Sequence, residues 1–276
     1  MPVKINHKGL TLVELLIAMV VSLIAIGLAY NTYSAQQRAY TNEQLVLDMQ
    51  QNSRAALAFM RREIRMAGYN PLKPFGTGGV VAGFKTARHD RLSFTLDLNE
   101  DGDDHDDNEC IVYRFKNVDD INEDGIADLG SADLFRFHRE GSDESGVFAF
   151  NIHAIAFAYA FDADIDGQLD GFADAPDVVI WAVDLDGDGM LDTYLDTNKD
   201  GVIDASDHPA GAALDDAVPI NRVRAVKIWL LARTRFPIHR HTENETYVVG
   251  MHRITPNDGF KRSLMTGIAM VRNPAS

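Results

Sequence analysis

The apolar positions of this chain fall into three zones, and the first is an unbroken apolar run. It extends from Gly9 to Tyr30 and reads GLTLVELLIAMVVSLIAIGLAY, with one charged residue, Glu14. About 20 apolar residues in a row predict a helix that crosses one bilayer. The leader before it contains Lys4 and Lys8 and no acidic residue. Lysines on that flank predict a cytoplasmic N-terminus.

The second zone continues the same helix as an amphipathic stripe. Apolar side chains recur at helical spacing at Leu45, Met49, Ala56, Phe59 or Met60, Ile64 and Ala67. Gly68 and then Pro71 predict the stop, because glycine accepts a positive φ and proline cannot continue a helix. We therefore expect one helix from Leu10 to Ala67, whose second half packs on a head domain.

The third zone contains short apolar runs of the kind found in β-strands. Roughly 200 residues follow Gly68, enough for one domain with a sizeable core. The runs are at 91–96, 110–115, 152–161, 178–183, 223–231, 246–252 and 264–271. No long helical pattern alternates with them. The expected fold class is α+β, with the N-terminal helix laid across an antiparallel sheet.

Glu14 is the unusual residue of the membrane segment. An ionised side chain costs several kcal/mol near the bilayer centre, so its presence predicts a partner. A secretory signal peptide would have a shorter apolar core followed by a small-residue cleavage site, whereas here the small residue, Gly9, precedes the core. The simpler alternative is a signal anchor whose glutamate reaches back toward the interface.

The order of Gly9, Leu10 and Glu14 resembles the prepilin signal of type IV pilins and type II secretion pseudopilins. The resemblance implies that a prepilin peptidase cleaves between Gly9 and Leu10 and that the new first residue is N-methylated. Glu14 would then be the fifth mature residue, which in this family is thought to meet the N-terminal amine of a neighbouring subunit. The family usually begins its mature chain with phenylalanine, so Leu10 is a departure that concerns methylation more than cleavage.

Three further segments resemble the PilW family of minor pilins. They are RREIRMAGYNP at 61–71, RAVKIWLLART at 224–234 and KRSLMTGIAMVRN at 261–273, so the resemblance covers the helix and the last third of the chain. It implies a type IV pilin-like fold with a leader at 1–9, an assembly helix at 10–67 and a head at 68–276. The implied partners are the prepilin peptidase, other minor and major pilins, the inner membrane and a tip adhesin.

The middle of the chain is strongly acidic. The net charge is -15, but residues 97–207 alone contain 31 acidic and 5 basic side chains, a balance of -26. The remainder contains 10 acidic and 21 basic side chains, a balance of +11. A run of like charge is usually a solvated face. These acids, however, repeat in a fixed order.

Five segments follow the pattern Asp-x-Asp/Asn-x-Asp-Gly, in which oxygens at positions 1, 3 and 5 can wrap a hard cation and glycine at position 6 permits a sharp turn. They are Asp97, Asn99, Asp101 and Gly102; Asp120, Asn122, Asp124 and Gly125; Asp162, Asp164, Asp166 and Gly167; Asp184, Asp186, Asp188 and Gly189; Asp196, Asn198, Asp200 and Gly201. Four add an acid at position 9, namely Asp128, Asp170, Asp192 and Asp204, and the last adds Asp207 at position 12.

None of the five has the glutamate that closes an EF-hand at position 12, so they resemble the loops of dockerin or thrombospondin-type repeats. We predict Ca²⁺ as the cofactor, with the number of sites open. Mg²⁺ fits less well, because it retains several waters in an octahedral shell. Calcium would cancel the repulsion between carboxylates and fix the adjoining strands.

Signatures of catalysis are missing from the sequence. It contains no G-x-S-x-G, no G-x-x-x-x-G-K-[ST] and no H-E-x-x-H. Cys110 is the only cysteine, so the chain forms no internal disulfide. Basic residues outside the acidic middle would have to form the patch that nucleic acid requires, and we give DNA binding little weight; they include Arg222, Arg224, Lys227, Arg233, Arg235 and Arg240.

The sequence therefore predicts a non-enzymatic minor pilin that initiates or supports assembly of a type IV pilus near its tip. It is anchored in the inner membrane before assembly and displays a calcium-stabilised head afterwards. Two alternatives stay open. One is a minor pseudopilin of type II secretion, similar to the J component. The other is a membrane-anchored, calcium-binding adhesin that acts in cell adhesion outside any filament.

Overall fold

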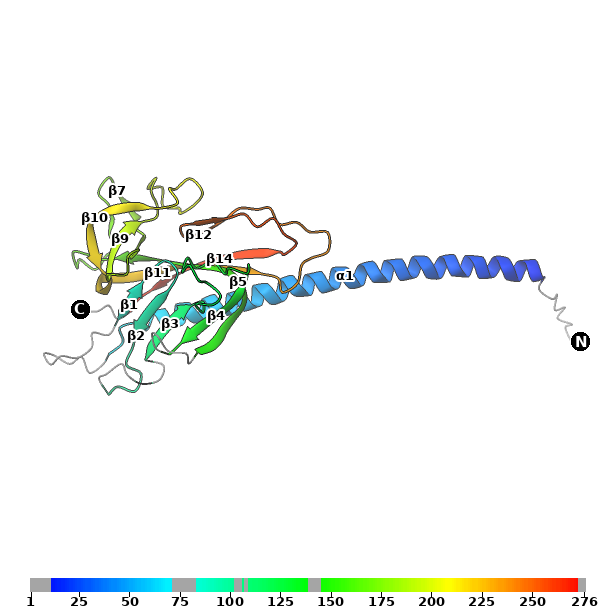
Figure 1. Ribbon diagram of the computed structural model, residues 1–276, viewed down its shortest axis with the longest axis horizontal. Helices are drawn as coiled ribbons and strands as arrows, with labels where there is room; N and C mark the ends of the chain where they lie inside the picture. The colour runs from blue at the N-terminus through cyan, green and yellow to red at the C-terminus, as the bar shows by residue number, and fades with distance from the viewer. Residues whose placement is uncertain (1–10, 71–82, 102–105, 107–108, 139–144, 273–276) are drawn as a thin grey trace, which may run out of the picture. The chain divides into compact units, whose positions relative to one another are not determined.

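The computed structural model describes residues 11–70, 83–101, 106, 109–138 and 145–272. The chain forms two compact units, Met1–Leu45 and Val46–Ser276. One helix, α1 (Leu12–Ile64), runs through the first unit and contributes its last turns to the second. All strands belong to the second unit and pair in antiparallel fashion (Figure 1). The predicted α+β class, with a long N-terminal helix and an antiparallel sheet, is confirmed.

Helix α1 ends close to the predicted stop. Its last helical residue is Ile64, and hydrogen-bonded turns then lead to Gly68, whose φ of 78° is the left-handed conformation that glycine accepts at no steric cost. The Gly68 amide donates to the Thr95 carbonyl at 2.9 Å, so the chain leaves the helix directly beside the sheet. Pro71, the second predicted stop residue, lies outside the described residues.

The main sheet has ten strands in the order β1-β2-β3-β4-β5-β8-β9-β10, and β11 joins the other edge of β5 and pairs in turn with β14. The 17-residue strand β5 is central, because β4 pairs with its first half and β11 with its second. The bounds are β1 Phe84–Ala87, β2 Leu92–Thr95, β3 Cys110–Arg114, β4 Ala132–Phe137, β5 Ser145–Phe161, β8 Ala182–Val183, β9 Met190–Tyr194, β10 Ala212–Pro219, β11 Val223–Arg233 and β14 Arg262–Met270. Two small ribbons pair β6 (Gly171–Phe172) with β7 (Ala175–Val179) and β12 (Tyr247–Val249) with β13 (His252–Ile254).

Five of the seven predicted strand segments coincide with strands β2, β3, β5, β11 and β14. The segment 178–183 is wrong as one strand, because it divides between the end of β7 and β8. The segment 246–252 is divided into β12 and β13 by a turn at Gly250, which has a φ of 58°. Strands β1, β4, β6, β9 and β10 were not predicted. These strands are short, or they contain acidic residues that lower the apparent β-propensity.

The last turns of α1 cover part of the sheet. Met60 and Ile64 are fully buried, and the Phe59 ring meets the Phe148 ring of β5 at 5.5 Å. A Cβ at Gly267 of β14 would lie 3.2 Å from Leu57, so glycine allows the helix to approach this strand closely. The predicted stripe therefore packs on the sheet.

A buried ion pair joins α1 to the sheet. Glu63 is 8% exposed, and its carboxylate accepts hydrogen bonds from Arg136 of β4 at 3.0 Å and from the Tyr113 hydroxyl of β3. Burial and the neighbouring Glu63 raise the pKa of Tyr113 well above its usual value. The hydroxyl therefore stays protonated and donates a hydrogen bond to Glu63. The charge of Glu63 is thus compensated within the interior.

A second buried network lies around His153 of β5. Arg262 of β14 donates to His153 Nδ1 at 2.8 Å and makes a paired contact with Asp258 at 2.6 and 2.7 Å. Burial, followed by the positive charges of Arg262 and Arg233, lowers the pKa of His153 to about 4. Neutral His153 is therefore the form that the fold selects.

We predict that Glu63→Gln destabilises the head by roughly 3 kcal/mol, because it removes the buried negative charge that accepts hydrogen bonds from Arg136 and Tyr113. Urea unfolding of the full chain, followed by fluorescence of Trp181 and Trp229, measures this change. Asp48→Asn, on an exposed part of the same helix, is the control and should alter stability by less than about 0.5 kcal/mol. Glu63→Met combined with Arg136→Met should recover most of the loss; no recovery would contradict an electrostatic origin.

We also predict that His153 makes the head less stable in mild acid. Its pKa is about 4 in the folded protein and about 6.5 when unfolded, so unfolding takes up a proton between these values. The free energy of unfolding should fall by up to about 3 kcal/mol as the pH drops from 6.5 to 4. His153→Gln can still accept from Arg262 and does not titrate. The free energy of unfolding of His153→Gln should therefore change less with pH over this range than that of the native chain. Parallel pH profiles for the two proteins would exclude His153 as the titrating group.

Candidate functional site

The five Asp-rich segments form loops at the ends of strands. We name them loop A (97–109), loop B (120–128), loop C (162–170), loop D (184–192) and loop E (196–207). Loop A follows β2, loop B lies between β3 and β4, loop C follows β5, loop D joins β8 to β9, and loop E joins β9 to β10. The first residue of every loop is buried, with exposures of 1% for Asp97, 6% for Asp120, 2% for Asp162, 2% for Asp184 and 0% for Asp196. Each loop is therefore anchored by a carboxylate at the edge of the core.

The described residues of the five loops share a positive φ at corresponding positions. The residue at position 4 has a positive φ in all five; these are Glu100 (64°), Glu123 (56°), Ile165 (67°), Gly187 (80°) and Lys199 (60°). The glycine at position 6 also has a positive φ in loops B to E, at Gly125 (77°), Gly167 (88°), Gly189 (87°) and Gly201 (88°). Gly102 of loop A lies outside the described residues. The repeated sequence pattern thus produces a repeated turn, in which position 6 requires glycine.

Hydrogen bonds turn the first carboxylate of loops B to E inward. In loop E, Asp196 accepts from the amides of Asp200 at 3.2 Å and Gly201 at 2.7 Å. Loops B and C repeat both contacts. In loop D, Asp184 accepts from Gly187 at 2.7 Å and Gly189 at 3.0 Å. The backbone therefore wraps around the carboxylate that would be the first ligand of a bound cation.

A second carboxylate closes each of four loops. In loops B and C this residue is at position 9, where Asp128 and Asp170 accept from the amide at position 2 at 2.8 and 2.9 Å. In loop E, Asp207 accepts instead from Thr197 at 2.7 Å and from Asp204 at 2.9 Å.

Loop A is closed in the same way by Glu109, which the sequence pattern missed. Glu109 accepts from the amides of Leu98 at 2.9 Å and Asp106 at 3.4 Å, as Asp207 does in loop E. Asp106 and Glu109 are three residues apart, like Asp204 and Asp207, but loop A is one residue longer. A search for acids at positions 9 and 12 of the pattern therefore misses Asp106 and Glu109. A search for two acids three residues apart would have found this pair.

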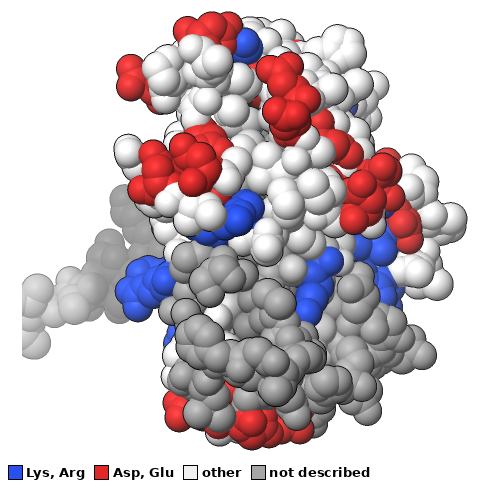
Figure 2. Space-filling view, turned by 90° about the vertical axis from the view of Figure 1, so that its left-hand side faces the viewer, with Lys and Arg blue, Asp and Glu red and all other residues white. Residues whose placement is uncertain are grey.

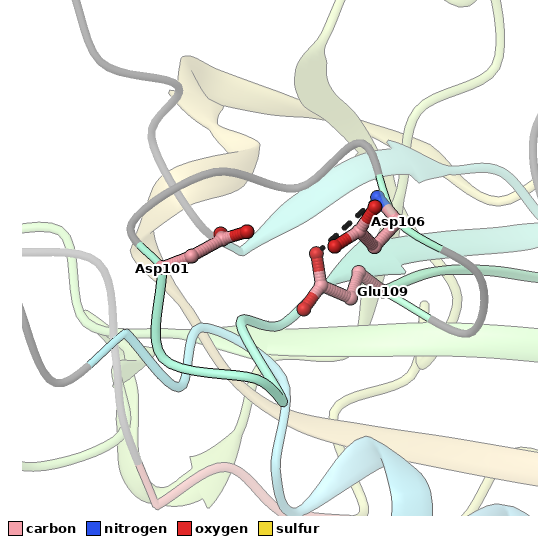
Figure 3. A group of neighbouring side chains, drawn as sticks. All are labelled: Asp101, Asp106 and Glu109. Atoms are coloured by element: carbon pink, nitrogen blue, oxygen red, sulfur yellow. Dashed lines mark hydrogen bonds between the residues drawn. The ribbon is translucent and has the colours of Figure 1, made fainter.

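Three acidic groups among the described residues could hold a metal ion. They are Asp101, Asp106 and Glu109 of loop A; Asp162, Asp164 and Asp170 of loop C; and Asp184, Asp186 and Asp192 of loop D. Within each group, one oxygen per residue lies within 4.8 Å of the others. In Figure 3 the loop A carboxylates approach one another from separate stretches of chain. Oxygen-only sets of this kind suit a hard divalent cation.

The other predicted ligands lie in the same loops but outside these three groups. They are Asp97, Asn99, Asp120, Asn122, Asp124, Asp128, Asp166, Asp188, Asp196, Asn198, Asp200, Asp204 and Asp207. Several bond to one another instead, as Asn122 does to Asp124 at 2.9 Å and Asn198 to Asp200 at 3.0 Å. Clustered carboxylates therefore mark loops A, C and D, whereas loops B and E have an amide, Asn122 or Asn198, at position 3.

The electrostatics favour loop D as a cation site. Burial raises the pKa of Asp184, backbone donors at Gly187 and Gly189 oppose that shift, and Asp188 and Asp186 add repulsion. In loop C, by contrast, Asp162 lies 3.6 Å from the Arg224 guanidinium. No Lys or Arg in the described part of the chain forms an ion pair with Asp184, Asp186 or Asp192. Figure 2 shows that Asp and Glu side chains gather in separate patches on one face of the head.

At the N-terminus, Glu14 has a local partner. Gly9 and Leu10, the predicted cleavage residues, lie outside the described residues. Thr11 donates its amide to the Glu14 carboxylate at 2.9 Å and its hydroxyl at 2.8 Å, while the Glu14 amide donates to Thr11 Oγ1 at 3.3 Å. This arrangement resembles a capping box at the start of α1. Helix α1 is long and apolar enough to cross a membrane.

The basic residues weighed for nucleic acid binding are largely engaged within the head. The Arg224 guanidinium faces the Asp162 carboxylate. Lys227 Nζ lies 5.2 Å from the centroid of the Trp229 ring, and Arg233 Cζ lies 4.1 Å from the centroid of the Phe260 ring. Arg235 stacks in the same way on Phe236 at 5.4 Å. Their positive charges are spread along β11 and the loop after it, among aromatic and acidic neighbours.

Comparison with known families matches three stretches of the chain. Residues 4–30 match the prokaryotic N-terminal methylation motif, residues 42–153 match prepilin peptidase-dependent protein B, and residues 122–273 match type IV pilus-assembly protein W. Among solved structures, the chain is similar to a type IV-like pilin, TTHA1219 from Thermus thermophilus, with 13% identity and a TM-score of 0.37, over 82% of this chain and 97% of that one. Curated proteins gave no match.

The match to type IV pilus-assembly protein W covers more than half of the chain, and the methylation motif precedes it on the apolar helix. These features fit an inner-membrane-anchored pilin that is later incorporated into a pilus, with a structural role. The chain belongs to the PilW family of type IV pilus-assembly proteins and is a type IV pilin-like minor pilin.

Proposed function

We propose that this minor pilin takes part in the initiation of a type IV pilus, close to the tip, and that calcium stabilises its displayed head. The observation that carries the assembly role is the methylation motif at 4–30, in which Glu14 lies at the start of an exposed apolar helix. The leader 1–9 is removed after Gly9, the helix 10–67 joins the filament and the head 68–276 is displayed. Partners are the prepilin peptidase, other minor and major pilins, and a tip adhesin.

The calcium role rests on the loops. Five buried first-position carboxylates stand beside strand ends, and three loops place acidic oxygens within 4.8 Å of one another. A cation bound there would offset carboxylate repulsion and hold the ends of β2, β5, β8 and β9. Ca²⁺ is preferred to Mg²⁺ because it accepts six to eight flexible oxygen ligands. Loop D is the first candidate, since its three carboxylates have no ion pair with a described Lys or Arg.

We predict that assembly depends on the charge of Glu14 and not on its helix cap. Glu14→Gln keeps a capping acceptor and removes the charge, whereas Thr11→Ala weakens the cap and keeps the charge. Pili counted on cells that carry each variant in place of the native chain should be strongly reduced by Glu14→Gln and near normal with Thr11→Ala. Intact mass of the membrane-extracted chain should show loss of residues 1–9 in both.

The opposite pattern, with pili lost in Thr11→Ala and retained in Glu14→Gln, would reduce Glu14 to a helix cap. If cells carrying either variant adhere normally although no pili form, the result would favour the adhesin that acts outside a filament. An uncut N-terminus would contradict the processing step itself.

We predict that calcium raises the melting temperature of the full chain in detergent. For a site with a dissociation constant near 0.1 mM, about 10 mM calcium should add roughly 2.7 kcal/mol. For a head of this size that gain corresponds to roughly 5–10 °C. Differential scanning fluorimetry with calcium, magnesium or chelator measures the shift.

Loop D provides the matched variants. Asp186→Asn with Asp192→Asn should lose part of the calcium response without losing stability in chelator, because the substitutions remove repulsion and leave Asp184 with both of its backbone donors. Asp215→Asn with Asp216→Asn, on β10 outside the loops, should keep the full response. Equal melting temperatures in calcium and chelator for the native chain would contradict the calcium proposal, and equal shifts in calcium and magnesium would contradict the choice of cation.

A further inference from the structure

Four arginines gather around a cavity at the end of α1. The cavity has a volume of about 510 Å³ and is lined by Ala58, Arg61, Arg62, Arg65, Met66 and Arg272. Arg272 comes from just beyond β14 and is brought to the helix by its backbone amide, which donates to the Arg65 carbonyl at 3.2 Å. We call this group the arginine pocket. It lies wholly within the unit formed by Val46–Ser276.

No acidic side chain in the described part of the chain forms an ion pair with these arginines. Arg61 donates to the Ile268 carbonyl at 2.9 Å, and all four arginine residues are exposed. Three other arginines of the head, Arg91, Arg136 and Arg262, are by contrast paired with carboxylates. The arginine pocket is therefore a concentration of positive charge that the described chain leaves unneutralised.

The position of three of these arginines has a simple local explanation, but that of Arg272 does not. Cations in the last turn of a helix interact favourably with its dipole, which accounts for Arg61, Arg62 and Arg65. Arg272 adds a fourth charge from a different element. Like charges three or four residues apart on a helix also repel. An anion in the pocket would offset this repulsion and could accept several charge-assisted hydrogen bonds.

Charge complementarity identifies the occupant. The chain's own residues 97–207 have a balance of -26. Five bound calcium ions would add ten positive charges, so about -16 would remain. A second copy of this chain therefore presents many carboxylates to the arginine pocket, with or without calcium. The net charge of -15 disfavours a long polyanion such as DNA, which would meet repulsion from the rest of the surface.

We infer that the arginine pocket is a docking site for the Asp-rich surface of a second copy of this chain. The two surfaces are different, so the contact is heterologous and can repeat from one copy to the next. This contact goes beyond the proposed function, because it concerns head-to-head recognition and needs neither Glu14 nor calcium.

The test is site-specific photo-cross-linking in membranes. A benzophenone amino acid replaces Ala58, which lines the pocket, in the full chain, and a differently tagged native copy is expressed with it. We expect a cross-linked product that contains both tags, with the attachment mapped by mass spectrometry to residues 97–207 of the second copy. About 0.5 M salt should reduce the yield several-fold, because surface charges are screened.

Arg62→Glu with Arg65→Glu should lower the yield at least tenfold, and Arg272→Glu alone should lower it several-fold from outside the helix. Arg38→Glu changes the charge by as much as Arg272→Glu does, at an exposed position of α1 outside the pocket, and should leave the yield unchanged. Tryptophan fluorescence identifies any variant that fails to fold. If the double helix variant is unfolded, the cross-linking yield of Arg272→Glu decides whether the proposal holds. Attachment to nucleic acid, to a different protein, to another part of the second copy, or to nothing would overturn the proposal, whatever the outcome of the Glu14 and calcium experiments.

Discussion

The contact between the last turns of α1 and the sheet is the constraint on which the head depends. Met60 and Ile64 supply the apolar part of this contact, and Glu63 supplies a charge that is buried with Arg136 and Tyr113. Apolar packing alone tolerates small shifts, whereas a buried charge with two donors is satisfied in few positions. Because Arg136 and Tyr113 belong to β4 and β3, the same contact also fixes these strands against the helix. The helix is thus part of the core of the head.

The loops extend this order to the ends of the strands. Every loop begins with a buried aspartate, so the conformation of the loop and the position of the strand before it are linked. Without a cation, backbone amides supply the favourable contacts, as Gly187 and Gly189 do for Asp184. The remaining carboxylates of loop D still repel one another. An arrangement that is already folded but electrostatically strained is well suited to bind a divalent cation with little further ordering.

Much of the fold could be predicted because its signals are local and periodic. The apolar run, the stripe that ends near Gly68 and the alternating segments of β11 and β14 identify the helix and sheet from sequence alone. Strands such as β9 and β10 could not be recognised, because they contain ligand-type and exposed acidic residues that resemble loops. The residue pattern likewise identified the five turns, whereas the role of Glu109 depends on a loop that is one residue longer. Its contacts with Leu98 and Asp106 exist only in three dimensions.

The distribution of charge is where sequence and structure must be combined. The sequence separates an acidic middle from basic flanks, but it does not show which of the basic residues neutralise the middle. The structure shows that Arg91 and Arg224 do so locally, through Glu123 and Asp162. It also shows that Arg61, Arg62, Arg65 and Arg272 meet at one place without a described carboxylate. Internal pairing therefore balances only part of the charge, and what remains is divided between loops suited to cations and a pocket suited to carboxylates. In a protein that exposes both surfaces, cations from solution can neutralise the acidic loops, and carboxylates of a neighbouring subunit can neutralise the arginine pocket.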